Sequence, residues 1–98
     1  MNINIEKENG RVLMKIEGRL DTTTAPELEK AINDEGSELK SLELDFGGVS
    51  YISSAGLRVL LTAQKKMNMQ GSMELTNVSA EVMDIFEMTG FADILSIR

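Results

Sequence analysis

The sequence predicts an α/β protein in which helices pack on a mixed, mostly parallel β-sheet. Some segments have alternating apolar and polar residues, which is typical of half-buried strands. Between them lie segments whose apolar residues recur at helical spacing. An Asn-Gly dipeptide between the first two strand segments favours a tight antiparallel turn. Helices separate the later strands, so those strands are expected to run parallel. The predicted order is β-β-α-β-α-β-α, in a single domain spanning residues 1–98.

The first predicted element is a β-hairpin. Asn9-Gly10 supplies the turn, and apolar residues recur at every second position on both sides of it, as one buried face requires. These residues are Ile3 and Ile5 before the turn, and Val12, Met14 and Ile16 after it. The alternation ends at Gly18.

A helix is expected after this hairpin. Thr24, Pro26 and Glu27 have the arrangement of a capping box, in which the Thr hydroxyl accepts from early amides and the Glu reaches back. Leu28, Ala31 and Ile32 follow at helical spacing, and the helix should end within residues 33–36.

The third strand is built on alternating apolar residues and should stop at Gly47-Gly48. A short apolar link over residues 49–52 would then lead into the next loop. The alternating residues are Leu42, Leu44 and Phe46.

The second helix is expected over residues 57–67, with Lys65 and Lys66 in its final turns, where basic side chains complement the helix dipole. A fourth strand follows around Met73 and Leu75, with Val78 as a candidate end, and Ser79 can cap a third helix that ends near Thr89-Gly90. The inward faces of the two helices are Leu57, Leu60, Leu61 and Ala63, then Val82, Met83, Ile85 and Phe86. Residues 91–97 form a last apolar segment whose type the pattern leaves open.

Charge and composition exclude several classes of function. The net charge is −6, which repels nucleic-acid phosphates and anionic membranes, so we expect neither as a partner and favour a basic protein. The absence of His removes a Ser-His-Asp triad and the usual zinc sites, and the absence of Cys removes thiolate metal sites. We therefore expect no enzyme, no metal and no cofactor.

Localisation can also be predicted from the sequence. No apolar run approaches the ~20 residues of a membrane-spanning helix, and residues 1–6 lack the basic start and apolar core of a signal peptide. The lack of Cys suits a reducing compartment. The expected location is the cytoplasm.

Two loops are candidates for a site, because parallel α/β sheets place sites where strands lead into helices. They are residues 18–24 and 47–56. In the second loop, Ser53 and Ser54 lie where free amides of a helix start would stabilise an anion such as a phosphate. The alternative is that one serine is only an N-cap, and that Gly56 serves only close packing. Asp21, in the first loop, could cap the first helix or contact a partner.

Taken together, these segments resemble the anti-sigma-factor antagonists, a family built on the STAS domain. Residues 18–28 are similar to the family's G-x-L-D-x-x-T-A-x-x-L segment, and residues 44–57 to its strand, linker and phosphorylation loop. Residues 79–94 are similar to its final helix. The resemblance covers nearly the whole chain in order, although a further C-terminal helix of many relatives is expected to be absent or reduced.

The resemblance implies a non-enzymatic partner switch. The dephosphorylated antagonist would bind an anti-sigma factor that is itself a GHKL-type serine kinase, and so release the sigma factor. The kinase would then phosphorylate Ser54, and a serine phosphatase would reset the switch. Ser53 replaces the family's loop Asp. Partner contacts are expected at Asp21, Thr22, Thr23, Ser53, Ala55, Gly56 and Leu57.

Two other interpretations remain open. The chain could be the STAS subunit of a lipid-transport or sensory complex, acting as an interaction module with Ser54 unmodified. A serine hydrolase or phosphotransferase using Ser54 is disfavoured, because the sequence shows no His and no well-placed base to activate it.

Overall fold

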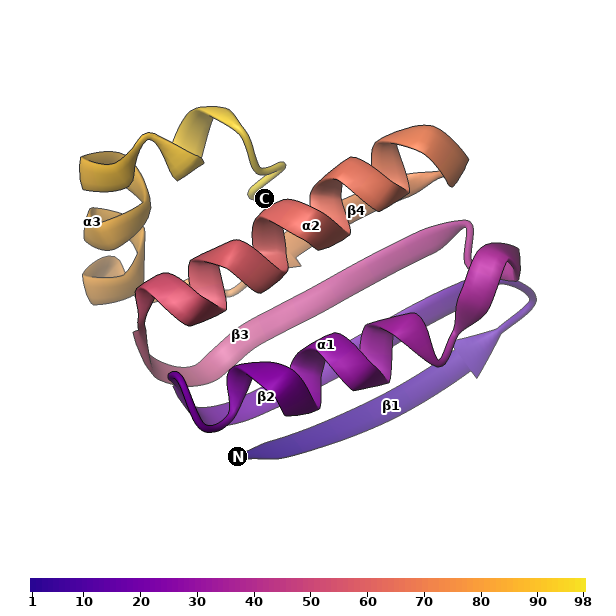
Figure 1. Ribbon diagram of the computed structural model, residues 1–98, viewed down its shortest axis with the longest axis horizontal. Coiled ribbons are helices and arrows are strands. Elements are labelled where there is room, and N and C mark those ends of the chain that lie inside the picture. Colours follow the sequence, from indigo (N-terminus) through magenta and orange to yellow (C-terminus); the bar gives the residue numbers. More distant parts are fainter.

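Four strands form one sheet in the order β1-β2-β3-β4 in the computed structural model, which describes residues 1–98 (Figure 1). β1 pairs antiparallel with β2, whereas β2–β3 and β3–β4 are parallel. This arrangement confirms the predicted mixed, mostly parallel sheet and the order of its elements. The strands are β1 (Asn2–Glu8), β2 (Arg11–Leu20), β3 (Ser41–Ile52) and β4 (Ser72–Thr76), and the helices are α1 (Ala25–Asn33), α2 (Ser54–Gln70) and α3 (Ala80–Thr89).

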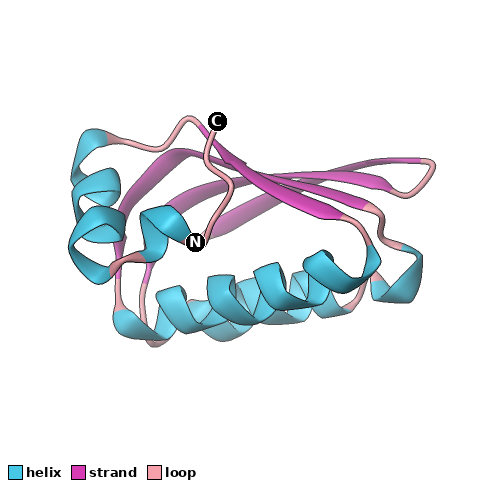
Figure 2. Cartoon of the chain, turned by 90° about the horizontal axis from the view of Figure 1, so that it is seen from above, coloured by secondary structure: helices cyan, strands magenta, loops and turns pink.

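The helices cover one face of the sheet. Figure 1 shows α1 and α2 side by side, and Figure 2 shows them on the same side of the sheet, with its other face bare. α3 lies near the start of α2 (Figure 1), where Phe86 packs on Phe46 of β3 with 6.4 Å between ring centroids. None of the helices combines the length and apolar character needed to cross a membrane.

The core lies between the sheet and its helices and consists of aliphatic residues, Met and two Phe. It contains 23 buried apolar residues in one cluster. Every second residue of β2 contributes, because Val12, Met14 and Ile16 point toward the helices. Leu28 and Ile32 of α1 face them from the other side, as their helical spacing predicts.

The predicted hairpin is confirmed. Asn9 and Gly10 both have positive φ, 48° and 81°, which is the backbone of a two-residue turn matched to the twist of the strands. β1 is more exposed than its alternation suggests, because it is an edge strand beyond the reach of α2, and Ile5 is 40% exposed.

β3 does not stop at Gly47-Gly48, so that prediction is wrong. The strand continues to Ile52, and residues 49–52 belong to it. At two places β3 has one residue more than β2, between the pairs Lys15–Asp45 and Glu17–Gly48 and again before Tyr51. A Cβ on Gly48 would lie 2.7 Å from the Glu17 side chain. The glycines therefore form an irregularity within the strand instead of its end.

The ends of the later elements also differ from prediction. α2 begins at Ser54 and continues to Gln70, so Lys65 and Lys66 lie before its last turn. β4 ends before Val78, while Ser79 caps α3 as predicted by accepting from the Val82 amide at 3.2 Å. The undetermined segment forms a short 3-10 helix over Phe91–Asp93, and a bridge then joins Ile97 to the β4 edge.

Candidate functional site

The two loops chosen from the sequence lie side by side at the carboxyl ends of β2 and β3. The last residues of these strands are paired, Leu20 with Ile52. The Ser53 amide then donates to the Leu20 carbonyl at 2.9 Å, which fixes the start of α2 against the end of β2. Asp21 and Ser54, which follow the paired ends of these two strands, therefore lie on neighbouring segments.

Ser53 and Ser54 have different positions at the start of α2. Ser53 is the N-cap, with extended backbone, and its Oγ accepts from the Gly56 amide at 3.4 Å. Ser54 is the first helical residue, and its side chain is exposed. The amides of Ser54 and Ala55 have no acceptor within the chain. They and the helix dipole create a local preference for negative charge beside the Ser54 hydroxyl.

Gly56 is a glycine because of close packing between the loops. A Cβ at this position would lie 2.8 Å from Leu20 Cγ, 2.9 Å from Ile52 Cγ1 and 3.0 Å from the Leu20 carbonyl oxygen. All these contacts are tighter than van der Waals distance. A side chain here would push the first turn of α2 away from the end of β2, so Gly56 sets the spacing of the site.

The β2–α1 loop is held by Asp21. Its Oδ1 accepts from the amides of Thr23 at 3.0 Å and Thr24 at 3.1 Å, and from the Thr23 hydroxyl at 2.7 Å. The pKa of Asp21 is lowered, chiefly by the hydrogen bond from the Thr23 hydroxyl and next by that from the Thr24 amide. Ionised Asp21 therefore acts as the cap of the turn that leads into α1.

The predicted capping box at Thr24 is wrong. Thr24 makes no side-chain cap bond to α1. Its hydroxyl instead donates to the Arg19 carbonyl at 2.7 Å and accepts from the Asp21 amide at 2.8 Å. The physical reason is that Pro26 has no amide hydrogen and the Glu27 amide already donates to the Thr24 carbonyl at 2.9 Å, which leaves the Thr24 hydroxyl to tie the loop to β2.

Arg19 and Tyr51 belong to this surface and were missed as site residues. The guanidinium carbon of Arg19 lies 4.3 Å from the centre of the Tyr51 ring, and its Nε lies 3.9 Å from Asp21 Oδ2. Both residues are exposed, Tyr51 by 38%. The sequence could have indicated Tyr51 as a site residue, because it is an aromatic residue at a position of β3 that faces away from the core.

Exposure divides the predicted phosphoacceptor and partner-binding residues into three groups. Thr22, Thr23 and Ser54 are exposed, and Asp21, Ser53 and Ala55 are half-buried. Gly56 and Leu57 are buried, so they shape the loop from within instead of offering side chains to a partner. The structure thus brings all these residues to one end of the sheet with different local roles.

The outer surface of α2 differs in charge from the protein as a whole. The helix contains Arg58, Lys65 and Lys66 and no acidic residue, although the chain has a net charge of −6. None of these cations takes part in the ion pairs of the structure. α2 itself is therefore net positive, which total charge could not reveal, and Glu29 of α1 lies beside Lys66 in a small hollow between the two helices.

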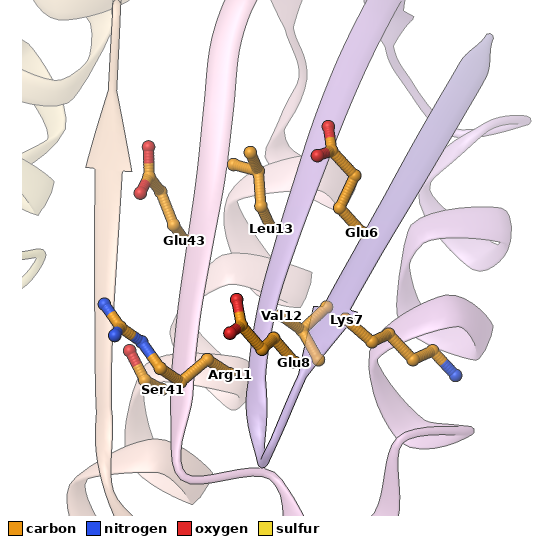
Figure 3. A pocket seen from close by; sticks show the side chains of 8 residues that line it. All are labelled: Glu6, Lys7, Glu8, Arg11, Val12, Leu13, Ser41 and Glu43. Carbon is orange, nitrogen blue, oxygen red and sulfur yellow. The ribbon is translucent and has the colours of Figure 1, made fainter.

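A shallow depression of about 360 Å³ lies elsewhere, near the start of β2 and β3. Glu6, Leu13 and Glu43 stand side by side on its neighbouring strands (Figure 3). Its lining mixes acidic and basic side chains and is open to solvent, and it lies at the opposite strand ends from Ser54. Nothing in it converges on a ligand, so the loop surface is the stronger candidate.

Known proteins with similar sequences align along almost the whole length of this chain. The anti-sigma-B factor antagonist of Listeria monocytogenes is 32% identical over 105 residues, covering 100% of this chain and 90% of that protein. That of Bacillus subtilis is 29% identical over 98 residues, covering 99% of this chain and 90% of that protein.

Solved structures share the fold. An anti-sigma factor antagonist from Mycobacterium paratuberculosis matches with a TM-score of 0.86 at 22% identity, covering 98% of this chain and 83% of that one. The unphosphorylated antagonist SpoIIAA matches with a TM-score of 0.78 at 16% identity, covering 99% of this chain and 87% of that one. The sequence model described as the STAS domain matches residues 2–98, and the chain therefore belongs to the STAS domain family.

Proposed function

We propose that this protein is an anti-sigma-factor antagonist whose binding to its anti-sigma factor is controlled by phosphate on Ser54. Relatives that bear the name of anti-sigma-B factor antagonist align along the full length of the chain. The observation that carries the site is the exposed Ser54 hydroxyl on the first residue of α2, beside a neighbour that serves as the cap. A solved relative is described as SpoIIAA in the phosphorylated form.

In the proposed cycle, the unphosphorylated protein binds an anti-sigma factor that is a GHKL-type serine kinase, and the sigma factor is released. The kinase transfers phosphate to the Ser54 hydroxyl, the antagonist dissociates, and a serine phosphatase removes the phosphate. The antagonist needs no catalytic residue of its own, because both reactions belong to its partners. The cytoplasm is the proposed location, where sigma factors act.

The physical basis of the switch is the charge that phosphorylation adds. A phosphoserine carries about −1.5 to −2 charges at neutral pH. In an interface that charge must be fully paired or it opposes association, because burying an unpaired charge is costly. Ser54 lies on a rigid strand-to-helix junction fixed by Gly56 and the Ser53–Leu20 hydrogen bond, so a partner meets the charge in a defined place.

The proposal is tested by purifying tagged wild-type, Ser54→Ala and Ser54→Asp proteins from the native cell and identifying what binds. The wild type and Ser54→Ala should retain the same kinase, because Ala removes only a hydroxyl, whereas Ser54→Asp should lose it. Equal retention by all three proteins would contradict control by charge at Ser54. Recovery of a transport ATPase in place of a kinase would assign the chain to another assembly.

A further inference from the structure

We propose that Arg58 binds the phosphate on Ser54 and holds it against the start of α2. This inference rests on the proposed function, because it concerns the same modified serine. It assigns a positioning role to a side chain outside the loop motif.

The geometry of α2 brings the two side chains together. Ser54 and Arg58 are four residues apart within one helix, so they lie one above the other on the same face. Both are exposed. Helical side chains lean toward the helix N-terminus, which carries the Arg58 side chain back over the turn that contains Ser54.

Arg58 is free to take this role. It takes part in none of the ion pairs and none of the side-chain hydrogen bonds of the structure, and α2 contains no carboxylate that could compete for it. The charged side chains of the neighbouring β2–α1 loop, Arg19 and Asp21, face each other at 3.9 Å and largely offset one another. Arg58 is thus the unpaired cation one turn away from the modified hydroxyl.

The chemistry of the pair is favourable. A guanidinium presents two parallel N–H donors that match two phosphate oxygens, and such charge-assisted bonds are stronger than neutral ones. The pairing has a consequence for the switch. Phosphorylation adds an anion and at the same time occupies Arg58, so the basic surface of α2 loses a free cation next to the site.

The experiment uses protein with phosphoserine installed at position 54 during translation, so that no kinase is needed. The second ionisation of the phosphate is followed by ³¹P NMR titration at an ionic strength of about 0.1 M in the wild type, Arg58→Gln, Arg58→Lys and Lys65→Gln. Arg58 favours the dianion and lowers the phosphate pKa. Arg58→Gln should therefore raise that pKa by roughly 0.3 of a pH unit, as expected for an exposed ion pair of this spacing.

Lys65→Gln is the matched control. It removes the same charge from the same exposed helix, but Lys65 lies 11 residues from Ser54, about 16 Å along the axis and beyond the screening length of ~10 Å. Its phosphate pKa should equal that of the wild type. Arg58→Lys should restore part of the shift, because Lys keeps the charge without the fork of donors. Thermal melts of the unphosphorylated variants check that each is folded.

An unchanged phosphate pKa in Arg58→Gln would overturn the proposal. Equal shifts in Arg58→Gln and Lys65→Gln would also overturn it, because they would reveal a general field of the helix. Either result leaves the switch itself intact, since the phosphate was installed without a partner. Conversely, a kinase that does not phosphorylate Ser54 in the cell would contradict the proposed function. The measured pairing of Arg58 with the phosphate would be unaffected.

Discussion

Asp21 shows how a single residue can have a structural role within a proposed binding surface. One carboxylate oxygen accepts from three donors in the β2–α1 loop, while the other oxygen lies near Arg19. From the sequence alone, capping and partner contact were both possible. The structure shows the carboxylate capping the turn that precedes α1, through the Thr23 and Thr24 amides, and leaves partner contact as a prediction.

The lowered pKa of Asp21 gives this capping role a pH dependence. Ionised Asp21 stabilises the fold at pH values above its ordinary pKa of about 3.9, and this contribution is lost as the pH falls through the lowered pKa of the folded state. Asp21→Ala should therefore lower the melting temperature by roughly 3–6 °C at pH 7, as for a lost helix cap, and by less at pH 3. Circular-dichroism melts at both pH values measure this.

Asp84→Ala is the control, because Asp84 is an exposed carboxylate on α3 without a hydrogen bond or ion pair. Its melting temperature should stay close to that of the wild type at both pH values. A deficit in Asp21→Ala that is as large at pH 3 as at pH 7 would show that its carboxylate charge is not what stabilises the loop.

Gly56→Ala tests the close packing of the two loops. The added methyl group would meet Leu20 and Ile52 at 2.8–2.9 Å. Overpacking costs ~1–3 kcal/mol, and the better helix propensity of Ala returns up to about 1 kcal/mol. The free energy of unfolding, measured with urea, should fall by about 1 kcal/mol. Ser54→Ala, two residues earlier and exposed, should change it by less than ~0.5 kcal/mol. Equal stabilities for both variants would mean that the packing can relax.

At the scale of elements, the sequence predicted the type and order of the strands and helices better than their ends. Alternation and helical spacing report burial against a sheet, so they identified β2, β3 and α3. They could not show that β3 passes through Gly47-Gly48, because a glycine pair is compatible with both a strand end and an irregularity. The capping box failed because Pro26 has no amide hydrogen and the Glu27 amide donates to the Thr24 carbonyl, which residue spacing alone does not show.

The start of α2 leads to a prediction about the two serines. Ser53 directs its hydroxyl to the Gly56 amide of its own first turn, whereas Ser54 presents its hydroxyl to solvent. The cognate kinase should therefore place a single phosphate on Ser54. Intact mass followed by fragment-ion mapping of residues 51–58 locates it.

Variants of the two serines complete that test. Ser54→Ala should abolish incorporation, and Ser53→Ala should retain it while losing about 1 kcal/mol of stability, as for a lost cap. Phosphate on Ser53, or phosphate that persists in Ser54→Ala, would overturn the assignment of the acceptor without removing the switch.

At the scale of the whole molecule, charge is distributed unevenly over the surface. The bare face of the sheet carries carboxylates such as Glu43 and Glu74, which Arg98 bridges at 3.3 and 3.1 Å. The exposed side of α2 is basic and continuous with Ser54. The net charge of the chain favoured a basic partner. Because it sums the charges of all residues, it did not show that the helix next to Ser54 is itself basic. A phosphate on Ser54 would place about −1.5 to −2 charges at the start of this basic helix, and that added charge is the physical core of the proposed switch.

The most direct test is the affinity of the purified anti-sigma factor for this protein with and without phosphate on Ser54, measured by isothermal titration calorimetry. Phosphorylation should weaken binding by about a hundredfold, equivalent to ~3 kcal/mol, while Ser54→Ala binds as tightly as the unphosphorylated protein. Equal affinities for the phosphorylated and unphosphorylated proteins would contradict the account.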